Sequence, residues 1–371
     1  MQLSLIALRS GRRLFATAAK HHVCGDPQKV LQLEAIDAIG KVGNDQVKIK
    51  FLASPINPSD INIVQGVYGL PTKVPAVGGN EGVAVVTEIG SNVNKLAVGD
   101  WVIPFHSGFG CWRTEALSDP AELIKIANDI PPAYAATLSV NPATAYRLLR
   151  DFGDLKPGDV IMQNGANSMV GLAVIQMARM MGIKTINIIR SDRPEADKVL
   201  RLLSNLGGDV NVLDTQVNTE GFNEILAELP PCKLAFNCIG GDAATEMVRC
   251  LAPGGTVVTY GGMSKRPLTI PTDLIVYKGL KLVGFWMADW YAARGASEKE
   301  KMINEIVGMI RSKQLAFFFE VHDFDDFHHA LETSLEPFNF RKVVLNLNYP
   351  DRLKEHDERN PEDYFVFEAD N

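Results

Sequence analysis

Between residues 160 and 284, short apolar segments with strand character alternate with segments of helical character. The expected strands are 160–163, 185–189, 234–238, 256–260 and 281–284, and the expected helices are 170–181, 194–206 and 243–251. Such an alternation produces βαβ units, whose parallel sheet is buried between helices on both faces. A sheet of this kind binds ligands beyond the carboxyl ends of its strands. The sequence therefore predicts an α/β fold with a doubly wound parallel sheet.

The segments on either side of this region are richer in strand patterns. VKIKFLAS at 47–54, VAVVTEIG at 83–90 and WVIPF at 101–105 suggest strands, whereas 131–150 and 298–312 suggest helices before a last strand at 342–347. A chain of 371 residues accommodates two domains. We predict a nucleotide-binding domain at 146–300, inserted between two parts of a β-rich catalytic domain at 21–145 and 301–350.

The two ends of the chain differ in charge. Residues 1–20 contain Arg9, Arg12, Arg13 and Lys20 but no acid. This pattern is typical of a mitochondrial transit peptide and predicts a matrix location, although a basic start of a cytosolic protein is the alternative. Residues 351–371 carry eight acids and three bases, and we interpret them as an acidic C-terminal extension.

Composition excludes several classes of protein. The net charge of −7 and the lack of a basic stripe argue against nucleic-acid binding. No apolar run reaches the roughly 20 residues of a membrane span. The five cysteines have no CxxC spacing, which indicates free thiols and argues against a four-cysteine zinc site.

The turn after the first strand of the parallel sheet is the candidate cofactor site. It reads NGANSMVG, with Gly165 and Gly171 at the passage from strand to helix and the short polar side chains of Asn167 and Ser168 between them. A helix N-terminus at this place can bind a diphosphate with its amides and its dipole. A full GxGxxG is absent, so a plain glycine-rich connector is the alternative.

The end of the second strand indicates which dinucleotide binds. Asp or Glu there holds the ribose 2′-hydroxyl of NAD. Here TINII leads into Arg190, and a guanidinium suits a 2′-phosphate. We therefore favour NADPH over NADH; the alternative is a solvated Arg190, with Asp192 on the ribose.

Two later strand ends suggest further cofactor contacts. Gly261 and Gly262 follow TVVTY, where backbone without side chains can approach a ring closely. Phe285 and Trp286 follow LVG at the next strand end. Adjacent aromatic residues at such a place suggest the lining of a pocket, although each could equally belong to the core.

Several motifs resemble those of the medium-chain dehydrogenase/reductase superfamily. They are INPSD at Ile56–Asp60, GVYG at Gly66–Gly69 and GGNEGVA at Gly78–Ala84. NSMVG, IIRSDRP, YGGM and GFWM resemble one branch in particular, the mitochondrial trans-2-enoyl-CoA reductases, also called 2-enoyl thioester reductases. This resemblance implies a Rossmann-type sheet domain beside a GroES-like β-rich catalytic domain.

The resemblance also implies the roles of individual residues. Tyr68 would be the proton donor, Asn141 would contact the nicotinamide end, and Lys342 would be a late cofactor contact. The diphosphate would contact Asn167, Ser168, Met169 and Val170. The 2′-phosphate would be held by Arg190 and Arg193 around Ser191 and Asp192. The cofactor and substrate channel would be lined by Tyr260, Gly261, Gly262, Met263, Phe285, Trp286 and Met287.

No metal is expected in the reaction. The zinc-dependent alcohol dehydrogenases of the superfamily carry a histidine before the motif glutamate, where this chain has Asn80 before Glu81. No cysteine lies in the early ligand region, and the histidines, including His328 and His329, have no spacing typical of metal ligands.

The implied activity is NADPH-dependent reduction of trans-2-enoyl thioesters of CoA or acyl carrier protein in mitochondrial fatty acid synthesis. Hydride would reach the β-carbon, and the phenol of Tyr68 would protonate the α-carbon. A homodimer is a further expectation of the family. The alternatives are a zinc-free NADPH quinone or alkenal reductase, and a protein that binds NADPH without turnover.

Overall fold

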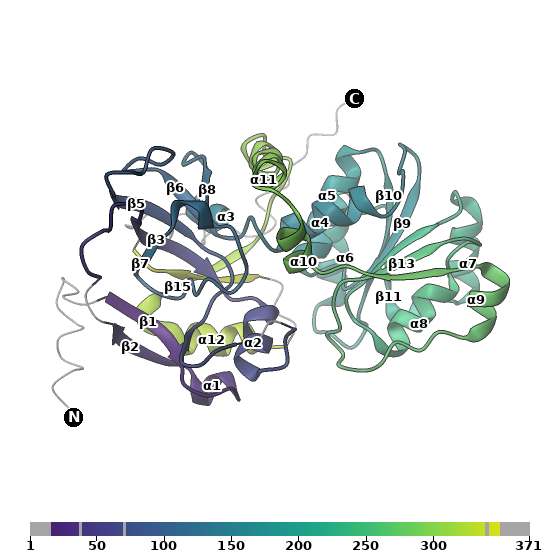
Figure 1. Cartoon of the computed structure of the whole chain (residues 1–371). Coiled ribbons are helices and arrows are strands. Elements are labelled where there is room, and N and C mark those ends of the chain that lie inside the picture. Colours follow the sequence, from purple (N-terminus) through teal and green to yellow (C-terminus); the bar gives the residue numbers. More distant parts are fainter. Residues whose placement is uncertain (1–15, 37–38, 70–71, 338–340, 349–371) are drawn as a thin grey trace. The chain divides into compact units, whose positions relative to one another are not determined.

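The structure is a computed structural model that describes residues 16–36, 39–69, 72–337 and 341–348 (Figure 1). These residues form two compact units. Unit 1 contains the described residues up to Thr137, then 295–300, then those from Phe319 onward; unit 2 contains 138–294 and 301–318. Among the described residues, no helix combines the length and apolar character needed to cross a membrane.

Unit 2 is built on a six-stranded parallel sheet with the order β11-β10-β9-β12-β13-β14. Its strands are β9 (Val160–Asn164), β10 (Lys184–Ile189), β11 (Val210–Leu213), β12 (Leu234–Asn237), β13 (Thr256–Thr259) and β14 (Lys281–Gly284). The chain first adds strands on one side of β9 and then continues with β12 on the other side. The switch point between β9 and β12 is where such sheets bind ligands.

Helices cover both faces of this sheet, with α5 on one face and α8 on the other (Figure 1). The helices are α4 (Asn141–Asp151), α5 (Met169–Met180), α6 (Ala196–Asn205), α7 (Glu220–Glu228), α8 (Gly241–Arg249), α9 (Thr272–Lys278) and α10 (Met287–Ala293). A short 3-10 helix spans Asp214–Gln216. Buried side chains such as Met162, Ile186 and Val257 form the core beneath the helices. The predicted α/β class and Rossmann-type sheet are confirmed.

Unit 1 contains a three-stranded and a seven-stranded sheet. The smaller sheet has the order β2-β1-β4, and the larger has β15-β16-β3-β5-β6-β8 with β7 paired to β3. The strands are β1 (Ala16–His21), β2 (Gln32–Ile36), β3 (Val47–Pro55), β4 (Ala76–Val77), β5 (Val83–Ile89), β6 (Trp101–Pro104), β7 (Glu115–Ser118), β8 (Leu123–Ile126), β15 (Phe319–Asp323) and β16 (Lys342–Asn346). The alternating VKIKFLAS pattern becomes β3, which pairs with β5, β7 and β16.

Few helices accompany these sheets, in agreement with the predicted GroES-like, β-rich domain. They are α1 (Pro27–Val30), α2 (Pro58–Gln65), α3 (Pro132–Ala136), α12 (Phe327–Leu335) and the 3-10 helices at Pro120–Glu122 and Phe324–Asp326. Helix α11 (Ala296–Arg311) contributes its first residues to unit 1 and the others to unit 2.

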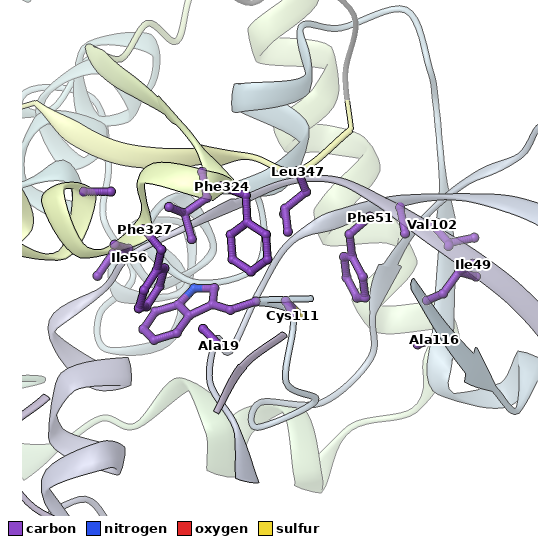
Figure 2. Packing of buried hydrophobic residues seen from close by; sticks show 14 of the residues in the cluster. Ala19, Ile49, Phe51, Ile56, Val102, Cys111, Ala116, Phe324, Phe327 and Leu347 are labelled. Atoms are coloured by element: carbon purple, nitrogen blue, oxygen red, sulfur yellow. The ribbon is translucent and has the colours of Figure 1, made fainter. Parts of the chain in front are cut away.

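The core of unit 1 is centred on aromatic side chains. Phe324 and Phe327 lie near Ile56 and Ala19, and Phe51 lies farther along the same cluster (Figure 2). The ring of Trp112 is fully buried and lies 5.4 Å from that of Phe327, measured between centroids. A Cβ atom on Gly78 would lie 2.3 Å from the Trp112 ring, so the GGNEG motif needs glycine here for close packing.

Some elements fall where the sequence analysis did not place them. Residues 16–20, predicted as the end of a transit peptide, belong to β1, whose Ala18 and Ala19 are completely buried. In unit 2, strand β11 and helices α7, α9 and α10 were not predicted. The nucleotide domain, predicted at 146–300, corresponds to a unit that starts at Leu138 and also takes in 301–318. Residues 1–15 and the acidic extension at 351–371 lie outside the described residues.

Candidate active site

The glycine-rich turn of unit 2 connects β9 to α5. The hydroxyl of Ser168 accepts the N–H of Gly171 at 3.1 Å and so caps the helix. A Cβ atom on Gly171 would lie 2.4 Å from the carbonyl oxygen of Ala166, so only glycine lets the helix start this close to the turn. Asn167, Ser168 and Met169 are partly exposed at this N-terminus. The turn therefore offers backbone N–H groups and a helix dipole to an anion such as a diphosphate.

A buried pair of asparagines fixes the neighbouring strand ends at the switch point. Nδ2 of Asn164, at the end of β9, donates to Oδ1 of Asn237, at the end of β12, at 2.8 Å. Oδ1 of Asn164 accepts the N–H of Cys238 at 2.8 Å. These bonds hold the turns after β9 and β12 in register with each other. The sequence analysis gave Asn164 no role, although it is the first residue of the NGANSMVG motif.

Two arginines lie after β10, as the sequence analysis expected. Arg190 is exposed, with Nε 3.4 Å from Oδ1 of Asp192, whereas Arg193 is buried. Burial, and then the positive charge of Arg190, lower the pKa of Arg193. The N–H of Ser191 donates to Oδ1 of Asp214 at 2.9 Å and fixes the loop. Two guanidinium groups close enough to repel each other form a site that suits a phosphate dianion.

Most of the other predicted cofactor contacts of unit 2 lie directly after its strands β13 and β14. Gly262 and Met263 are exposed after β13. The hydroxyl of Tyr260 is buried, and this burial raises its pKa well above the ordinary value. Phe285 packs against Phe152 with ring centroids 5.6 Å apart.

Asn141, at the first turn of α4, carries a polar atom that the protein does not satisfy. Its Oδ1 is buried and has no hydrogen-bond partner among the described residues. Such an acceptor is costly to bury unless a ligand donates to it. A carboxamide N–H₂, as in nicotinamide, would supply the missing donor. Together with the α5 N-terminus and the arginine pair, Asn141 makes unit 2 fit a phosphorylated nicotinamide dinucleotide.

Tyr68 lies in unit 1, directly after α2. Pro58 occupies the first turn of this helix, where its missing N–H is tolerated. Gly66 ends the helix in the left-handed conformation, with φ of 73°, and its N–H donates to the carbonyl of Ile63 at 2.9 Å. Tyr68 follows two residues later and is partly exposed. The capped end of the helix therefore helps to determine the position of the backbone at Tyr68.

A buried carboxylate fixes the start of α2. The carboxylate oxygens of Asp60 accept the N–H of Asn57 and the N–H of Asn80, each at 2.7 Å. Burial raises the pKa of Asp60 to about 6, although these two hydrogen bonds and the charge of Lys342 act in the opposite direction. The INPSD and GGNEG motifs are thus joined through one side chain. The sequence analysis quoted both motifs but gave Asp60 no role.

Asn57 and Lys342 extend this buried network. Nδ2 of Asn57 donates to Oε1 of Glu81 at 2.9 Å, and Nζ of Lys342 donates to Oδ1 of Asn57 at 2.6 Å. The structure thus places the Lys342 ammonium among polar groups of unit 1. Its role as a cofactor contact stays a prediction.

The side chain of Asn80, which precedes the motif glutamate Glu81, makes hydrogen bonds within unit 1. Its Nδ2 donates to the hydroxyl of Ser59 at 3.2 Å, and its Oδ1 accepts the N–H of Gly108 at 2.8 Å. Asn80 thus contributes to the same polar network as Asp60. The expected absence of a catalytic metal stays a prediction.

Comparisons with known proteins agree with this division into two units. Residues 43–128 match the family model described as alcohol dehydrogenase GroES-like domain, and residues 170–306 match the one described as zinc-binding dehydrogenase. The mitochondrial enoyl-[acyl-carrier-protein] reductase of Rattus norvegicus is 48% identical over 87% of this chain and 86% of its own length. That of Homo sapiens is 45% identical over 90% of this chain and 89% of its own length.

The fold of this chain is also similar to that of a solved structure. The Etr1p/NADP/crotonyl-CoA complex superposes with a TM-score of 0.83 at 33% identity. The match covers 90% of this chain and all of that one. It therefore extends across both units rather than the nucleotide-binding fold alone.

The raised pKa of Asp60 predicts a specific dependence of stability on pH. Folded Asp60 binds a proton more readily than the unfolded residue, with a pKa of about 6 against 3.8. Stability contributed by this group is therefore greatest below pH 3.8 and falls as the pH rises through 6. Between pH 7 and pH 5, the wild type should gain about 1 kcal/mol of unfolding free energy relative to Asp60→Asn.

Urea unfolding of both proteins at the two pH values measures this difference, and the subtraction removes the contributions of other titrating groups. An unchanged difference between the two proteins would mean that Asp60 titrates in the folded protein as it does in the unfolded one.

Proposed function

The chain belongs to the family of mitochondrial enoyl-[acyl-carrier-protein] reductases, and from this premise we propose that Tyr68 is its proton donor and that the strand ends of unit 2 bind its cofactor. The chain is an oxidoreductase that reduces enoyl thioesters with NADPH. The observation that best supports the proposed sites is that three features of unit 2 match the parts of NADPH: the N-terminus of α5, the two neighbouring arginines after β10, and the buried Oδ1 of Asn141, which has no hydrogen-bond partner among the described residues.

The reaction needs a hydride, a proton and stabilisation of charge. NADPH, when bound, supplies the hydride. The thioester carbonyl makes the β-carbon of the substrate electrophilic, and negative charge then accumulates on the carbonyl oxygen as an enolate. Hydrogen-bond donors can hold that oxygen, and an acid must protonate the α-carbon.

We assign the proton to the hydroxyl of Tyr68. A phenol stays protonated at neutral pH, because its ordinary pKa is about 10, yet it can transfer a proton to a strongly basic enolate. The cap at Gly66 and the hydrogen bonds of Asp60 support this assignment, because they hold the two ends of α2 and so position the backbone that leads to Tyr68. In this proposal Asp60 is a positioning residue and has no contact with substrate.

Replacing Tyr68 with phenylalanine should reduce turnover of crotonyl-CoA by about 100-fold or more, the usual effect of losing an acid catalyst. The KM for NADPH should stay unchanged, since the proposed cofactor residues other than Lys342 belong to unit 2. NADPH oxidation at 340 nm measures both values. Tyr277→Phe is the control, because it removes a phenol hydroxyl from a tyrosine on α9 that is neither the proposed proton donor nor part of the proposed cofactor site. Undiminished turnover in Tyr68→Phe would exclude it from the mechanism.

We assign the 2′-phosphate of NADPH to Arg190 and Arg193. In the folded chain their positive charges oppose each other, and a phosphate would relieve that repulsion with charge-assisted hydrogen bonds. Asn141 would accept from the carboxamide, and the turn at Asn167–Val170 would hold the diphosphate.

Removing both guanidinium groups, in Arg190→Ala/Arg193→Ala, should raise the KM for NADPH by about 100-fold or more, because each of the two lost hydrogen bonds to a charged group contributes about 1.5–3 kcal/mol. The KM for NADH, which lacks the 2′-phosphate, should hardly change. The two single variants divide the effect between the arginines. Arg201→Ala, on the exposed side of α6, is the control. An equal loss with both cofactors would indicate that the arginines support the fold instead.

We further propose that the chain forms a homodimer through the edge of the unit 2 sheet. Strand β14 ends the sheet and pairs only with β13 among the described residues. Large apolar side chains are exposed on this strand and on the helix that precedes it in the sequence: Leu282 on β14, and Ile275, Val276 and Tyr277 on α9. An open strand edge with adjacent apolar surface is a template for a second copy. One structural relative is described as an Etr1p/Etr2p heterodimer.

Placing a charge on this edge, with Leu282→Lys, should convert the dimer to a monomer in size-exclusion chromatography with light scattering. Ile225→Lys is the matched control, because Ile225 is exposed to a similar degree on α7. A wild-type protein that elutes as a monomer, or a Leu282→Lys variant that stays dimeric, would contradict this interface.

The chain is a mitochondrial protein, like the relatives it matches. We propose that a targeting segment, if removed, ends before Ala16, because cleavage at residue 20 would delete β1 and its buried Ala18 and Ala19.

A further inference from the structure

Three side chains of the metal-ligating type meet at one end of unit 1. His322 lies on β15, Asp326 immediately precedes α12, and His329 lies in the first turn of that helix. One potential ligand atom from each lies within 4.8 Å of the corresponding atoms of the other two. None of these residues belongs to the proposed cofactor site or to the network around Asp60.

A well-packed connection brings the three together. The 3-10 turn between β15 and α12 contains Phe324 and is followed by Phe327, and both aromatic side chains are completely buried. Strand β15 is paired with β16 over its full length, with His322 opposite Leu345. Asp326 and His329 are three residues apart at the helix start and so face the same side. The cluster is therefore held by the backbone on both sides.

The two imidazole rings lie close together in this cluster. The imidazole rings of His322 and His329 have centroids 5.3 Å apart and meet edge to face. Asp326 occupies the N-cap position of α12, yet its carboxylate accepts no capping hydrogen bond. Oε1 of Glu320 lies 3.2 Å from Nε2 of His322. A carboxylate beside one ring nitrogen is the common outer contact of a metal-binding histidine, because it orients the ring and makes it more basic.

The surroundings favour a cation. Asp326 also borders a surface depression lined by Asp323, Phe324, Asp325 and the end of β16 at Asn346–Asn348. The charged residues of this lining are all acidic, so the local potential attracts positive ions and repels anions.

We propose that His322, Asp326 and His329 bind one divalent transition-metal ion, with Zn²⁺ as the best match, and that water completes the coordination. Two imidazoles and one carboxylate suit zinc and similar metals, whereas magnesium and calcium prefer oxygen ligands alone. Ligand atoms about 2.0–2.1 Å from a tetrahedral ion are roughly 3.3 Å apart. The ligand atoms lie within 4.8 Å of one another, so rotation of the exposed side chains of Asp326 and His329 must bring them closer together. The ion would join β15 to α12 and takes no part in the reduction.

The test uses the full chain without a histidine tag and with Cys24→Ser, because Cys24 is an exposed thiol that could also bind zinc. After chelator treatment, calorimetric titration with ZnCl₂ should show one equivalent bound at this site. His329→Ala should weaken that binding by more than about 10-fold, and Glu320→Gln by about 10-fold, the usual effect of losing an outer contact. Zinc should also raise the melting temperature of the Cys24→Ser chain, which is the parent of all the variants, but not that of His329→Ala.

His328→Ala is the matched control, because His328 is the exposed neighbour on the same helix and lies outside the cluster. It should bind zinc as the parent does. Equal weakening in both histidine variants, unchanged binding in His329→Ala, or no stoichiometric binding by the parent would overturn the proposal. Melting temperatures measured without zinc establish that each variant is folded. If His329→Ala does not fold, Asp326→Asn takes its place as the variant that lacks one ligand. NADPH oxidation with crotonyl-CoA should be the same in all of them.

Discussion

Unit 1 depends on one buried carboxylate that holds two backbone segments together. Asp60 accepts an N–H from the start of α2 and another from the GGNEG loop, each at 2.7 Å, although burial raises its pKa to about 6. Replacing it with a neutral side chain would remove at least one of these bonds. The C-cap of α2, Gly66, lies two residues before Tyr68, so the position of the proposed proton donor depends on an interaction at the opposite end of the helix.

In unit 2, the parallel sheet brings groups from distant parts of the sequence to one edge. Parallel strands achieve this because all their carboxyl ends lie together. The pair Asn164–Asn237 then fixes the two strand ends on either side of the switch point. The turn before α5 and the arginines after β10 need no contact with each other, because the sheet register already sets their separation.

The sequence was informative where the pattern was local and repeated. Five strands of the parallel sheet and helices α5, α6 and α8 could be predicted, because apolar runs and glycine turns alternate regularly there. Strand β11 was missed because VNVL is short and flanked by polar residues. Strand β1 was missed because its alanines lie in a basic segment typical of a targeting signal. The roles of Asp60 and Asn164 could not be predicted, since they depend on partners 20 and 73 residues away.

Burying a polar or charged group is unfavourable, and whether the protein itself compensates for that cost distinguishes the proposed binding residues from the structural ones. The buried Oδ1 of Asn141 has no donor in the part of the chain that the structure describes, and the charge of Arg190 adds to the effect of burial on the pKa of Arg193; a bound dinucleotide would relieve both. Asp60 is also unfavourable to bury, but backbone N–H groups of the protein satisfy it. By the same criterion Lys342, with its ammonium 2.6 Å from Oδ1 of Asn57, has a partner within its own unit. If it also contacts the cofactor, as the sequence resemblance implies, that contact must be shared with Asn57 or replace it.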